Sequence, residues 1–423
     1  MKTFVCLFML LFACAISWSE EDGNSKKTTN VEKADPKVKL KDGDIVALCG
    51  DSITSNGFYP YFIEMYQLVC APAPKVTLKN FGQWGKTAND FPPLMDASVL
   101  PLKPAAATIC YGMNNSRSSK VMSDESAKNW GTGEITTVIK KFKGAGIREI
   151  FLGSPGCVDS EFFTLSQSLP SDPKAVEATN KNLSLLRDNA EKIAKAEGLV
   201  FVDVHTPMIE VMAKAKEKYG KDFPFAGGKG DGVHPGQAGH LVMAWAFIKA
   251  FGYSGEIGTI TLDFAKDTAE ATTGHSVIAC KSGVVSLESS RYPFCFSGDP
   301  EKPSAGSTRS VAGLFPFNED LNRFTLVVKG APAKTKITWG KVSKEYDSAT
   351  LSKGINLASE FMDNPFGPAF AKVFEALQER NRCYGWLAKE YKDNPDMQKR
   401  LERALVAATP VPVKHEIKIE PVN

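Results

Sequence analysis

The stretch that decides the fold runs Asp44-Ile45-Val46-Ala47-Leu48-Cys49 and continues as Gly50-Asp51-Ser52-Ile53-Thr54. Its first half is a short continuous apolar run, which is typical of a strand buried on both faces. Its second half is a turn that begins with glycine and presents a hydroxyl group. Four more apolar runs of this kind follow, so the predicted strands cover residues 45–49, 76–81, 106–110, 149–153 and 199–203.

Longer segments with a helical spacing of apolar residues separate these strands. They predict helices over residues 59–69, 135–143, 175–196, 208–219 and 238–251. Short apolar strands that alternate with helices indicate a parallel sheet with helices on both faces, so we expect an α/β fold of three layers. In such sheets ligands bind beyond the carboxyl ends of the strands. Ser52 follows the first strand and Asn114 follows the third, so both fall on the edge that should carry the site.

The pattern changes beyond residue 252. Turn-bounded β-type runs predict a small β-rich accessory module over residues 253–345; they cover residues 259–264, 275–280, 284–288, 324–328 and 336–339. Helical spacing returns after Asn364, and Glu416-Ile417-Lys418-Ile419 alternates like an edge strand. Residues 346–423 are therefore predicted to form a C-terminal helical segment and tail, and the catalytic domain is predicted to cover residues 41–252.

The N-terminus has the pattern of an export signal. A basic start, Met1-Lys2-Thr3, precedes an apolar run from Phe4 to Ala15 and then small and acidic residues. The run is shorter than the roughly 20 residues that a membrane span needs. We therefore predict a signal peptide over residues 1–19, a flexible leader over residues 20–40, no membrane span, and a periplasmic or extracellular protein. Leu11-Phe12-Ala13-Cys14 resembles a bacterial lipobox, so a lipid anchor at Cys14 stays an alternative.

Composition sets further bounds. The chain has 51 basic and 48 acidic residues, a net charge of +3, which gives no reason to expect a nucleic-acid partner. Hydrophobic residues make up 43% of its 423 residues, so it can bury substantial cores. An exported compartment permits disulfides, and Cys280 with Cys295 is one candidate pair, but the connectivity and the oligomeric state stay open.

Three residues can perform acyl transfer. A serine hydroxyl is a poor nucleophile at neutral pH, so it needs a base to take its proton and a third group to hold that base in the right tautomer. Ser52 supplies the hydroxyl, and Asp231-Gly232-Val233-His234-Pro235 supplies an imidazole with a carboxylate three residues before it. Because Asp231 and His234 share one short loop, only Ser52 has to be brought to them by the fold.

The same chemistry needs donors for the oxygen that becomes negative in the tetrahedral intermediate. The turn Asn80-Phe81-Gly82-Gln83-Trp84-Gly85-Lys86-Thr87 follows the second strand, where Gly85, or alternatively Gly82, can offer a backbone N–H. With the amide of Asn114 and the N–H of Ser52, Gly85 would complete an oxyanion hole of three donors. Trp84 and Arg117 are candidate substrate contacts, the alternatives being a core tryptophan and a solvated loop arginine.

The segments around Ser52, Gly85, Asn114 (Gly112-Met113-Asn114-Asn115) and His234 together resemble the SGNH (GDSL-type) hydrolases, which are named for a serine, a glycine, an asparagine and a histidine in this order. The resemblance covers roughly residues 41–252 and implies a flavodoxin-like α/β/α sandwich and ester cleavage through an acyl-enzyme. It makes Ser52 the nucleophile, His234 the base, Asp231 its orienting partner, and Gly85 and Asn114 the oxyanion donors. Asn115 departs from the family, which usually has aspartate there. No set of ligands completes a metal site with His240, so we expect neither a metal nor a cofactor.

Many exported members of this family remove small acyl groups, often acetyl, from carbohydrates. The resemblance therefore implies an exported serine esterase acting on acetyl esters of a small-molecule or polysaccharide substrate. Three alternatives stay open: a lipase or thioesterase, an acyltransferase with the same triad, and a non-catalytic glycan-binding protein. The β-rich module would either bind glycan or shield a face of the catalytic domain.

Overall fold

The computed structural model describes residues 37–165, 171–226, 231–389 and 393–422. The predicted signal peptide, Cys14 and nearly all of the predicted leader lie outside these residues. Five parallel strands form the central sheet in the order β2-β1-β3-β4-β5. They are β1 Ile45–Gly50, β2 Thr77–Asn80, β3 Ala106–Cys110, β4 Glu149–Gly153 and β5 Val200–Val202. The predicted α/β fold with a parallel sheet is confirmed.

Two hydrophobic cores lie on the two faces of this sheet. Along β1, Val46 and Leu48 belong to one core while Ala47 and Cys49 belong to the other, as the alternation of side chains in a strand requires. All four residues are fully buried, which explains why the strand reads as a continuous apolar run. The site that follows β1 therefore stands on a segment fixed from both sides.

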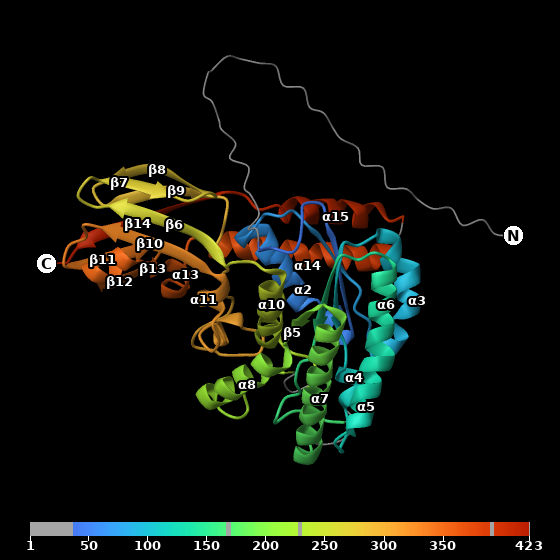
Figure 1. Cartoon of the computed structure of the whole chain (residues 1–423). Coiled ribbons are helices and arrows are strands. Elements are labelled where there is room, and N and C mark those ends of the chain that lie inside the picture. The colour runs from blue at the N-terminus through green and yellow to red at the C-terminus, as the bar shows by residue number, and fades with distance from the viewer. Residues whose placement is uncertain (1–36, 166–170, 227–230, 390–392, 423) are drawn as a thin grey trace. The chain divides into compact units, whose positions relative to one another are not determined.

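Helices cover both faces of the sheet (Figure 1). The α-helices of this region are α1 Ser52–Asn56, α2 Phe58–Met65, α3 Pro92–Leu94, α4 Met113–Ser116, α5 Asp124–Asn129, α6 Thr136–Gly144, α7 Pro173–Glu197, α8 His205–Tyr219 and α10 Gln237–Phe251. Single turns of π-helix lie at Tyr66–Cys70, Met95–Val99 and Trp130–Ile135, and 3₁₀ turns lie at Ala88–Asp90 and Leu100–Leu102. The longest helix, α7, begins with the Asp172 side chain as its cap and Pro173 in its first turn, and it ends at Gly198 with φ +66°.

The remaining strands form two further sheets. Their orders are β13-β10-β6-β7 and β12-β11-β14-β9-β8. The strands are β6 Glu256–Asp263, β7 Thr268–Ala271, β8 His275–Lys281, β9 Val284–Ser289, β10 Arg323–Lys329, β11 Lys334–Trp339, β12 Val342–Asp347, β13 Ile355–Asn356 and β14 Val413–Pro421. Short helices accompany them: Thr308–Ser310, α11 Phe317–Leu321, α12 Ser348–Lys353 and α13 Leu357–Glu360.

The prediction of an edge strand near the C-terminus is wrong. β14 pairs with β11 on one side and with β9 on the other, so it is the middle strand of its sheet. Its inward residues His415, Ile417 and Ile419 are buried while the residues between them are exposed. Such alternation marks any strand with one solvent face, central or edge, and it carries no information about neighbours.

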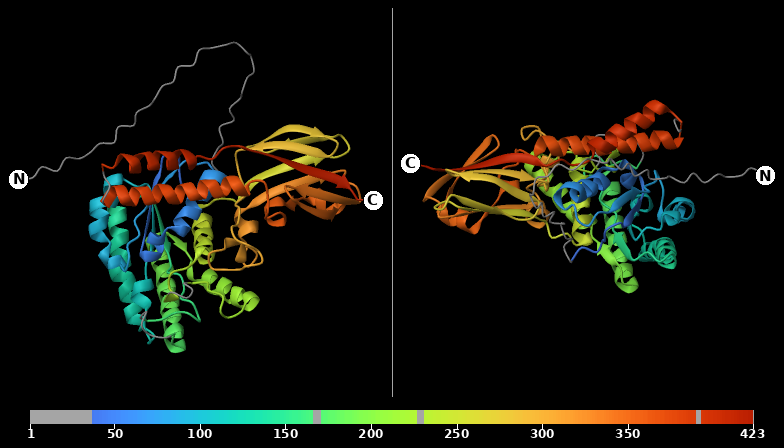
Figure 2. Two further views of the ribbon diagram at one scale, coloured as in Figure 1. Left: turned by 180° about the vertical axis from the view of Figure 1, so that it is seen from behind. Right: turned by 90° about the horizontal axis from the view of Figure 1, so that it is seen from above.

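Two long helices precede β14. α14 (Gly367–Lys389) and α15 (Pro395–Ala407) lie side by side (Figure 2). α14 also contacts α2, where Nη1 and Nη2 of Arg380 donate to the carboxylate of Glu64 at 2.8 and 2.7 Å and Phe374 stacks on Phe62. No helix of the described residues is long and apolar enough to cross a membrane.

The cysteines of the described chain are free thiols. The candidate pairing of Cys280 with Cys295 is therefore wrong: Cys280 is half-buried in β8, whereas Cys295 is buried, with its Sγ directed at the carbonyl of Pro293 and the side chain of Asn364. Cys49 and Cys110 are buried in β1 and β3, where a thiol packs as a small hydrophobic group.

Candidate active site

Ser52 is the first residue of α1, directly after β1 and the turn at Asp51. The Asp51 carboxylate accepts a hydrogen bond from the N–H of Ile53 at 3.0 Å and caps the helix. Gly50 is required beside it, since a Cβ there would lie 2.0 Å from Oγ1 of Thr54 and 2.7 Å from the carbonyl oxygen of Cys110. Burial raises the pKa of Asp51 to about 6, although the Ile53 N–H and the nearby His234 act in the opposite direction.

The fold brings Ser52, His234 and Asp231 together. Nε2 of His234 lies 2.7 Å from Oγ of Ser52, and its Nδ1 lies 2.5 Å from Oδ2 of Asp231. These partners assign the proton to Nδ1, so that Nε2 accepts from the serine hydroxyl. The side chains of His234 and Asp231 are 27% and 22% exposed, so the imidazole is accessible from solvent.

The environment of Asp231 keeps its carboxylate charged. Burial raises the pKa of Asp231. Three hydrogen bonds lower it: one from the His234 ring and two from the backbone N–H groups of Val233 (2.7 Å) and His234 (3.0 Å). The hydrogen bonds outweigh burial, so the pKa of Asp231 lies below its usual value. A charged carboxylate at Nδ1 stabilises the imidazolium that forms when the base takes a proton.

A buried ion pair that the sequence did not reveal supports this loop. Asp159 is fully buried, lies 2.9 Å from Nζ of Lys216, and accepts hydrogen bonds from the N–H groups of Phe225 and Ala226. Its own N–H donates to the carbonyl of Gly232 at 2.7 Å, one residue after Asp231. The only signal in the sequence is a carboxylate directly after the apolar pair Cys157-Val158.

The turn after β2 distinguishes the two glycine candidates. The N–H of Gly82 donates to Oδ1 of Asn80 at 2.8 Å, so it is already used. Gly85 has φ +67°, and its N–H makes no hydrogen bond with any described residue. Nδ2 of Asn114 donates to the carbonyl of Lys86 at 2.9 Å, which joins the amide to this turn and leaves its second N–H for another acceptor. The arrangement favours Gly85 over Gly82.

Trp84 and Arg117 lie in different surroundings. Trp84 is 63% exposed and its ring centroid lies 5.4 Å from that of His234, so the alternative of a core tryptophan is wrong. The guanidinium of Arg117 donates to the carbonyls of Leu165 (3.0 Å) and Thr164 (3.4 Å). Arg117 thus fixes a neighbouring loop, and a substrate contact by this residue stays a prediction.

Asn115, the departure from the family pattern, has a local reason. Its Nδ2 donates to Oε1 of Glu134 at 3.0 Å. An aspartate at this position would place a second carboxylate against Glu134, and like charges at such a distance repel. Asparagine at position 115 and glutamate at position 134 are therefore matched.

The other histidines of this region are structural. Nδ1 of His205 bonds to the carbonyl of Gly156 at 2.7 Å, and burial lowers the pKa of this histidine. His240 is fully buried, accepts from the N–H of Tyr59, and has its pKa lowered to about 3 by burial. Within the described ranges no group of three or more histidine, cysteine or acidic residues is placed to hold a metal ion. The glycine-rich segment 227–230 lies outside those ranges.

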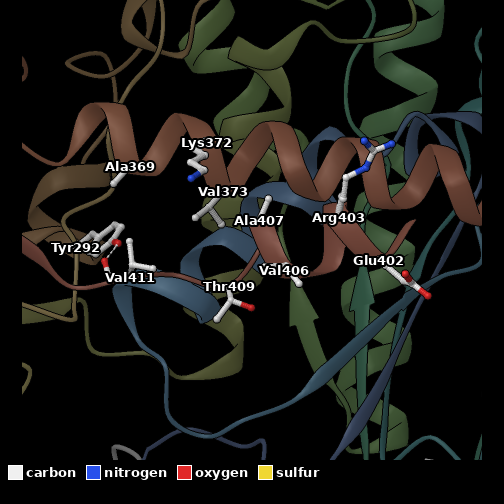
Figure 3. Close-up of a pocket in the computed structure, with 10 residues that line it drawn as sticks. All are labelled: Tyr292, Ala369, Lys372, Val373, Glu402, Arg403, Val406, Ala407, Thr409 and Val411. Carbon is white, nitrogen blue, oxygen red and sulfur yellow. Dashed lines mark hydrogen bonds between the residues drawn. The ribbon is translucent and has the colours of Figure 1, made fainter. Parts of the chain in front are cut away.

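A mostly apolar cavity of about 480 Å³ lies away from these residues (Figure 3). Its walls come from α14 and α15, with Tyr292 and Val411 at one end (Figure 3). None of the predicted site residues lines it, so its size does not make it the catalytic pocket.

A serine, its base and an orienting carboxylate at the carboxyl edge of a parallel sheet define an α/β serine hydrolase. Residues 48–242 match the GDSL-like Lipase/Acylhydrolase family. This part of the chain belongs to that family of SGNH-type hydrolases, and the protein is an enzyme that acts on carboxylic esters.

Solved structures resemble the chain to different extents. BT4096, described as a gut microbial diltiazem-metabolizing enzyme, is 21% identical with a TM-score of 0.67, and the match covers 90% of this chain and 98% of that one. It therefore shares the fold well beyond the catalytic region. The acetylxylan esterase Axe2 from Geobacillus stearothermophilus is 19% identical with a TM-score of 0.39, covering 51% and 97%. LAE5, an alpha/beta hydrolase from the metagenome of Lake Arreo in Spain, is 18% identical with a TM-score of 0.36, covering 50% and 97%. No curated protein sequence matches the chain.

Proposed function

We propose that the protein is an exported serine esterase that removes small acyl groups, acetyl first among them, from carbohydrates. One observation carries the proposal: Oγ of Ser52, the ring of His234 and the carboxylate of Asp231 form a continuous hydrogen-bonded chain of 2.7 and 2.5 Å. Export follows from the predicted signal peptide over residues 1–19, and it is tested by finding the cleaved protein outside the cytoplasm.

The proposed cycle starts with attack of the Ser52 oxygen on the ester carbonyl while Nε2 of His234 takes the hydroxyl proton. The resulting oxyanion accepts from the N–H groups of Ser52 and Gly85 and from the amide of Asn114. Ser52 opens α1, so its N–H has no partner within the helix. Collapse of the intermediate releases the alcohol with the proton held by His234, and the same imidazole then activates a water that hydrolyses the acyl-enzyme.

The alcohol part of this proposal has structural support. The exposed ring of Trp84 beside His234 offers the alcohol part of an ester a flat apolar surface. Many exported members of the family remove acetyl groups from carbohydrates, which supports an acetylated carbohydrate as the substrate.

A chain-length series tests the proposal. The mature protein is assayed with 4-nitrophenyl esters from acetate to octanoate and with acetylated polysaccharides, and Ser52→Ala serves as the control. We expect kcat/KM to fall beyond about butyrate and to vanish in Ser52→Ala, since a small acyl site excludes longer chains. A steep rise with chain length contradicts the small-acyl assignment, full activity in Ser52→Ala contradicts the nucleophile, and acylated products with an added sugar acceptor indicate an acyltransferase.

A further inference from the structure

One short segment after β4 is bonded directly to the loop that carries the proposed base. It covers residues 159–165 and is called the bracing segment below. The N–H of Asp159 donates to the carbonyl of Gly232 at 2.7 Å, and the N–H of Thr164 donates to the carbonyl of Asp231 at 3.4 Å. The bracing segment thus binds two consecutive carbonyls of the loop, one of them on the residue that orients the base.

The packing between the two stretches is equally close. Gly232 has φ +65°, and a Cβ added to it would lie 2.2 Å from the backbone nitrogen of Phe163 and 2.3 Å from its Cα. Only a residue without a side chain can therefore stand at position 232. Because backbone lies against backbone, a shift of the bracing segment moves the loop with it.

The carboxylate of Asp159 fixes the first end of the bracing segment. It is fully buried, and its Oδ1 accepts from the N–H of Glu161 at 2.9 Å and lies 2.9 Å from Nζ of Lys216. Its Oδ2 accepts from the N–H groups of Phe225 (3.0 Å) and Ala226 (3.3 Å). One buried charge therefore joins the bracing segment to α8 and to the chain that leads into the loop.

The other end of the bracing segment is bonded to the turn that carries the proposed oxyanion asparagine. Nη2 of Arg117 donates to the carbonyls of Leu165 at 3.0 Å and Thr164 at 3.4 Å, and its guanidinium carbon lies 5.9 Å from the centre of the Phe163 ring. Arg117 directly follows α4, the short helix that contains Asn114. The bracing segment is thus in contact with both halves of the site.

We propose that the bracing segment sets the position of the loop that carries Asp231 and His234 relative to the oxyanion turn, with Asp159 and Arg117 as positioning residues. The inference rests on the proposed roles of the triad and of Asn114. Ester cleavage needs the base and the oxyanion donors around one carbonyl group, and a misplacement of about 1 Å by a remote substitution can lower the rate about 10²-fold. In this account Arg117 acts on the geometry of the site and not on the substrate.

Arg117→Gln tests the proposal at an exposed position, where the fold should persist. We expect kcat for 4-nitrophenyl acetate to fall about tenfold while KM stays within about twofold, because the change affects geometry and not substrate binding. Arg323→Gln is the matched control and should equal the wild type, since the guanidinium of Arg323 also donates to backbone carbonyls, those of Glu319 and Ser254 among them. Unchanged kcat in Arg117→Gln overturns the proposal. A raised KM with normal kcat also overturns it, since that result indicates a substrate contact.

A double-mutant cycle tests whether the bracing segment acts through Asp231. Asp159→Asn should lower kcat about 10- to 100-fold in a protein that urea unfolding shows to be folded. In Asp231→Asn the carboxylate that the bracing segment places is gone, so a further Asp159→Asn or Arg117→Gln should lower the remaining kcat less than about twofold. Equal losses in both backgrounds indicate general damage and overturn the proposal. If Asp159→Asn does not fold, the cycle with Arg117→Gln decides.

Ser52→Ala, assayed in parallel, separates this inference from the proposed function. Full activity in Ser52→Ala contradicts the nucleophile, and the positioning roles fail with it. An inactive Ser52→Ala enzyme together with normal kcat in Arg117→Gln leaves the triad in place and overturns the role of the bracing segment alone.

Discussion

Within the described residues a serine hydroxyl meets a histidine ring in two clusters, and one of them is built for catalysis. In the catalytic region Ser52 meets His234, which Asp231 holds. In the β-rich region Oγ of Ser289 lies 2.8 Å from Nδ1 of His275 and 2.9 Å from Nε2 of His415. The distances in the two clusters are nearly the same, so proximity alone does not make a nucleophile.

The second cluster is a closed chain of hydrogen bonds. Nε1 of Trp339 donates to Nδ1 of His415, which fixes the proton of that ring on the nitrogen facing Ser289. Ser289 then donates to His275, whose Nε2 donates to the carbonyl of Ile257 at 3.0 Å. His275 and His415 are 6% and 5% exposed and Ser289 is fully buried.

Three differences separate the clusters. His234 is held by a carboxylate that can stabilise a positive ring, whereas His275 meets a neutral carbonyl. The side chain of His234 is 27% exposed, whereas the second cluster is closed to substrate. The donors proposed for an oxyanion, Gly85 and Asn114, belong to the first cluster. Burial lowers the pKa of His275 to about 4 and that of His415 to about 3, so both rings are neutral at pH 7 and the cluster serves to join strands.

Paired serine substitutions should separate the clusters most strongly. Ser52→Ala should lower kcat/KM for 4-nitrophenyl acetate by about 10⁴- to 10⁶-fold, the usual loss when a nucleophile is removed. Ser289→Ala should leave kcat/KM within about twofold but lower the free energy of unfolding by roughly 1–3 kcal/mol, because two buried ring nitrogens lose their partner. Kinetics and urea unfolding measure the two effects, and the comparison fails if Ser289→Ala loses activity while it remains folded.

Replacing the carboxylate of Asp231 should cause the next largest loss of activity. Asp231→Asn keeps an acceptor for the loop N–H groups but no longer fixes the imidazole tautomer or its charge, so kcat should fall by about 10⁴-fold. Asp222→Asn, an exposed acid of the same region, is the control and should match the wild type. A loss below about tenfold in Asp231→Asn would mean that the short bond to His234 is structural.

The oxyanion donors should contribute less than the triad. Asn114→Ala should reduce kcat by about 10²- to 10³-fold, the usual effect of one lost donor. KM should change little, because the donor acts mainly in the transition state. Asn80→Ala is a useful contrast, since its amide bonds to the carbonyl of Thr54 and its oxygen to the N–H of Gly82. A normal kcat in Asn114→Ala would contradict the assignment of Asn114 as an oxyanion donor.

The sequence predicts those parts of the fold and of the site that depend on local patterns, and it misses those that depend on contacts between distant segments. Apolar runs predicted the five parallel strands to within about two residues, and four separated motifs predicted which side chains would meet, although Ser52 and His234 are 182 residues apart. The middle position of β14 depends on strand pairing, which alternation does not encode. The support of the Asp231 loop by Asp159 and Lys216 depends on contacts between distant segments that no local pattern records.

Acid should lower the free energy of unfolding through the two buried histidines of the second cluster. The pKa values of His275 and His415 are depressed in the folded state, so below about pH 6.5 the unfolded chain binds more protons and stability falls as pH falls. Each ring contributes up to about 1.4 kcal/mol per pH unit between pH 6.5 and its folded pKa. Nearby Arg291 disfavours protonation of His275 further. The buried His205 and His240 act in the same direction.

Urea unfolding at pH 7, 6 and 5 measures this dependence. His415→Gln should show a shallower dependence than the wild type, because one of the histidines that unfolding exposes to protonation is gone. Identical slopes in the two proteins would contradict the assignment of a neutral, buried His415.

Covalent labelling tests the central claim most directly, namely that Ser52 alone is activated. The full-length protein is treated with a fluorophosphonate, digested and analysed by mass spectrometry. We predict one phosphonylated serine, Ser52, with labelling lost in Ser52→Ala, strongly slowed in Asp231→Asn and unchanged in Ser289→Ala. Labelling of a serine other than Ser52, or no labelling of the folded protein, would contradict the account.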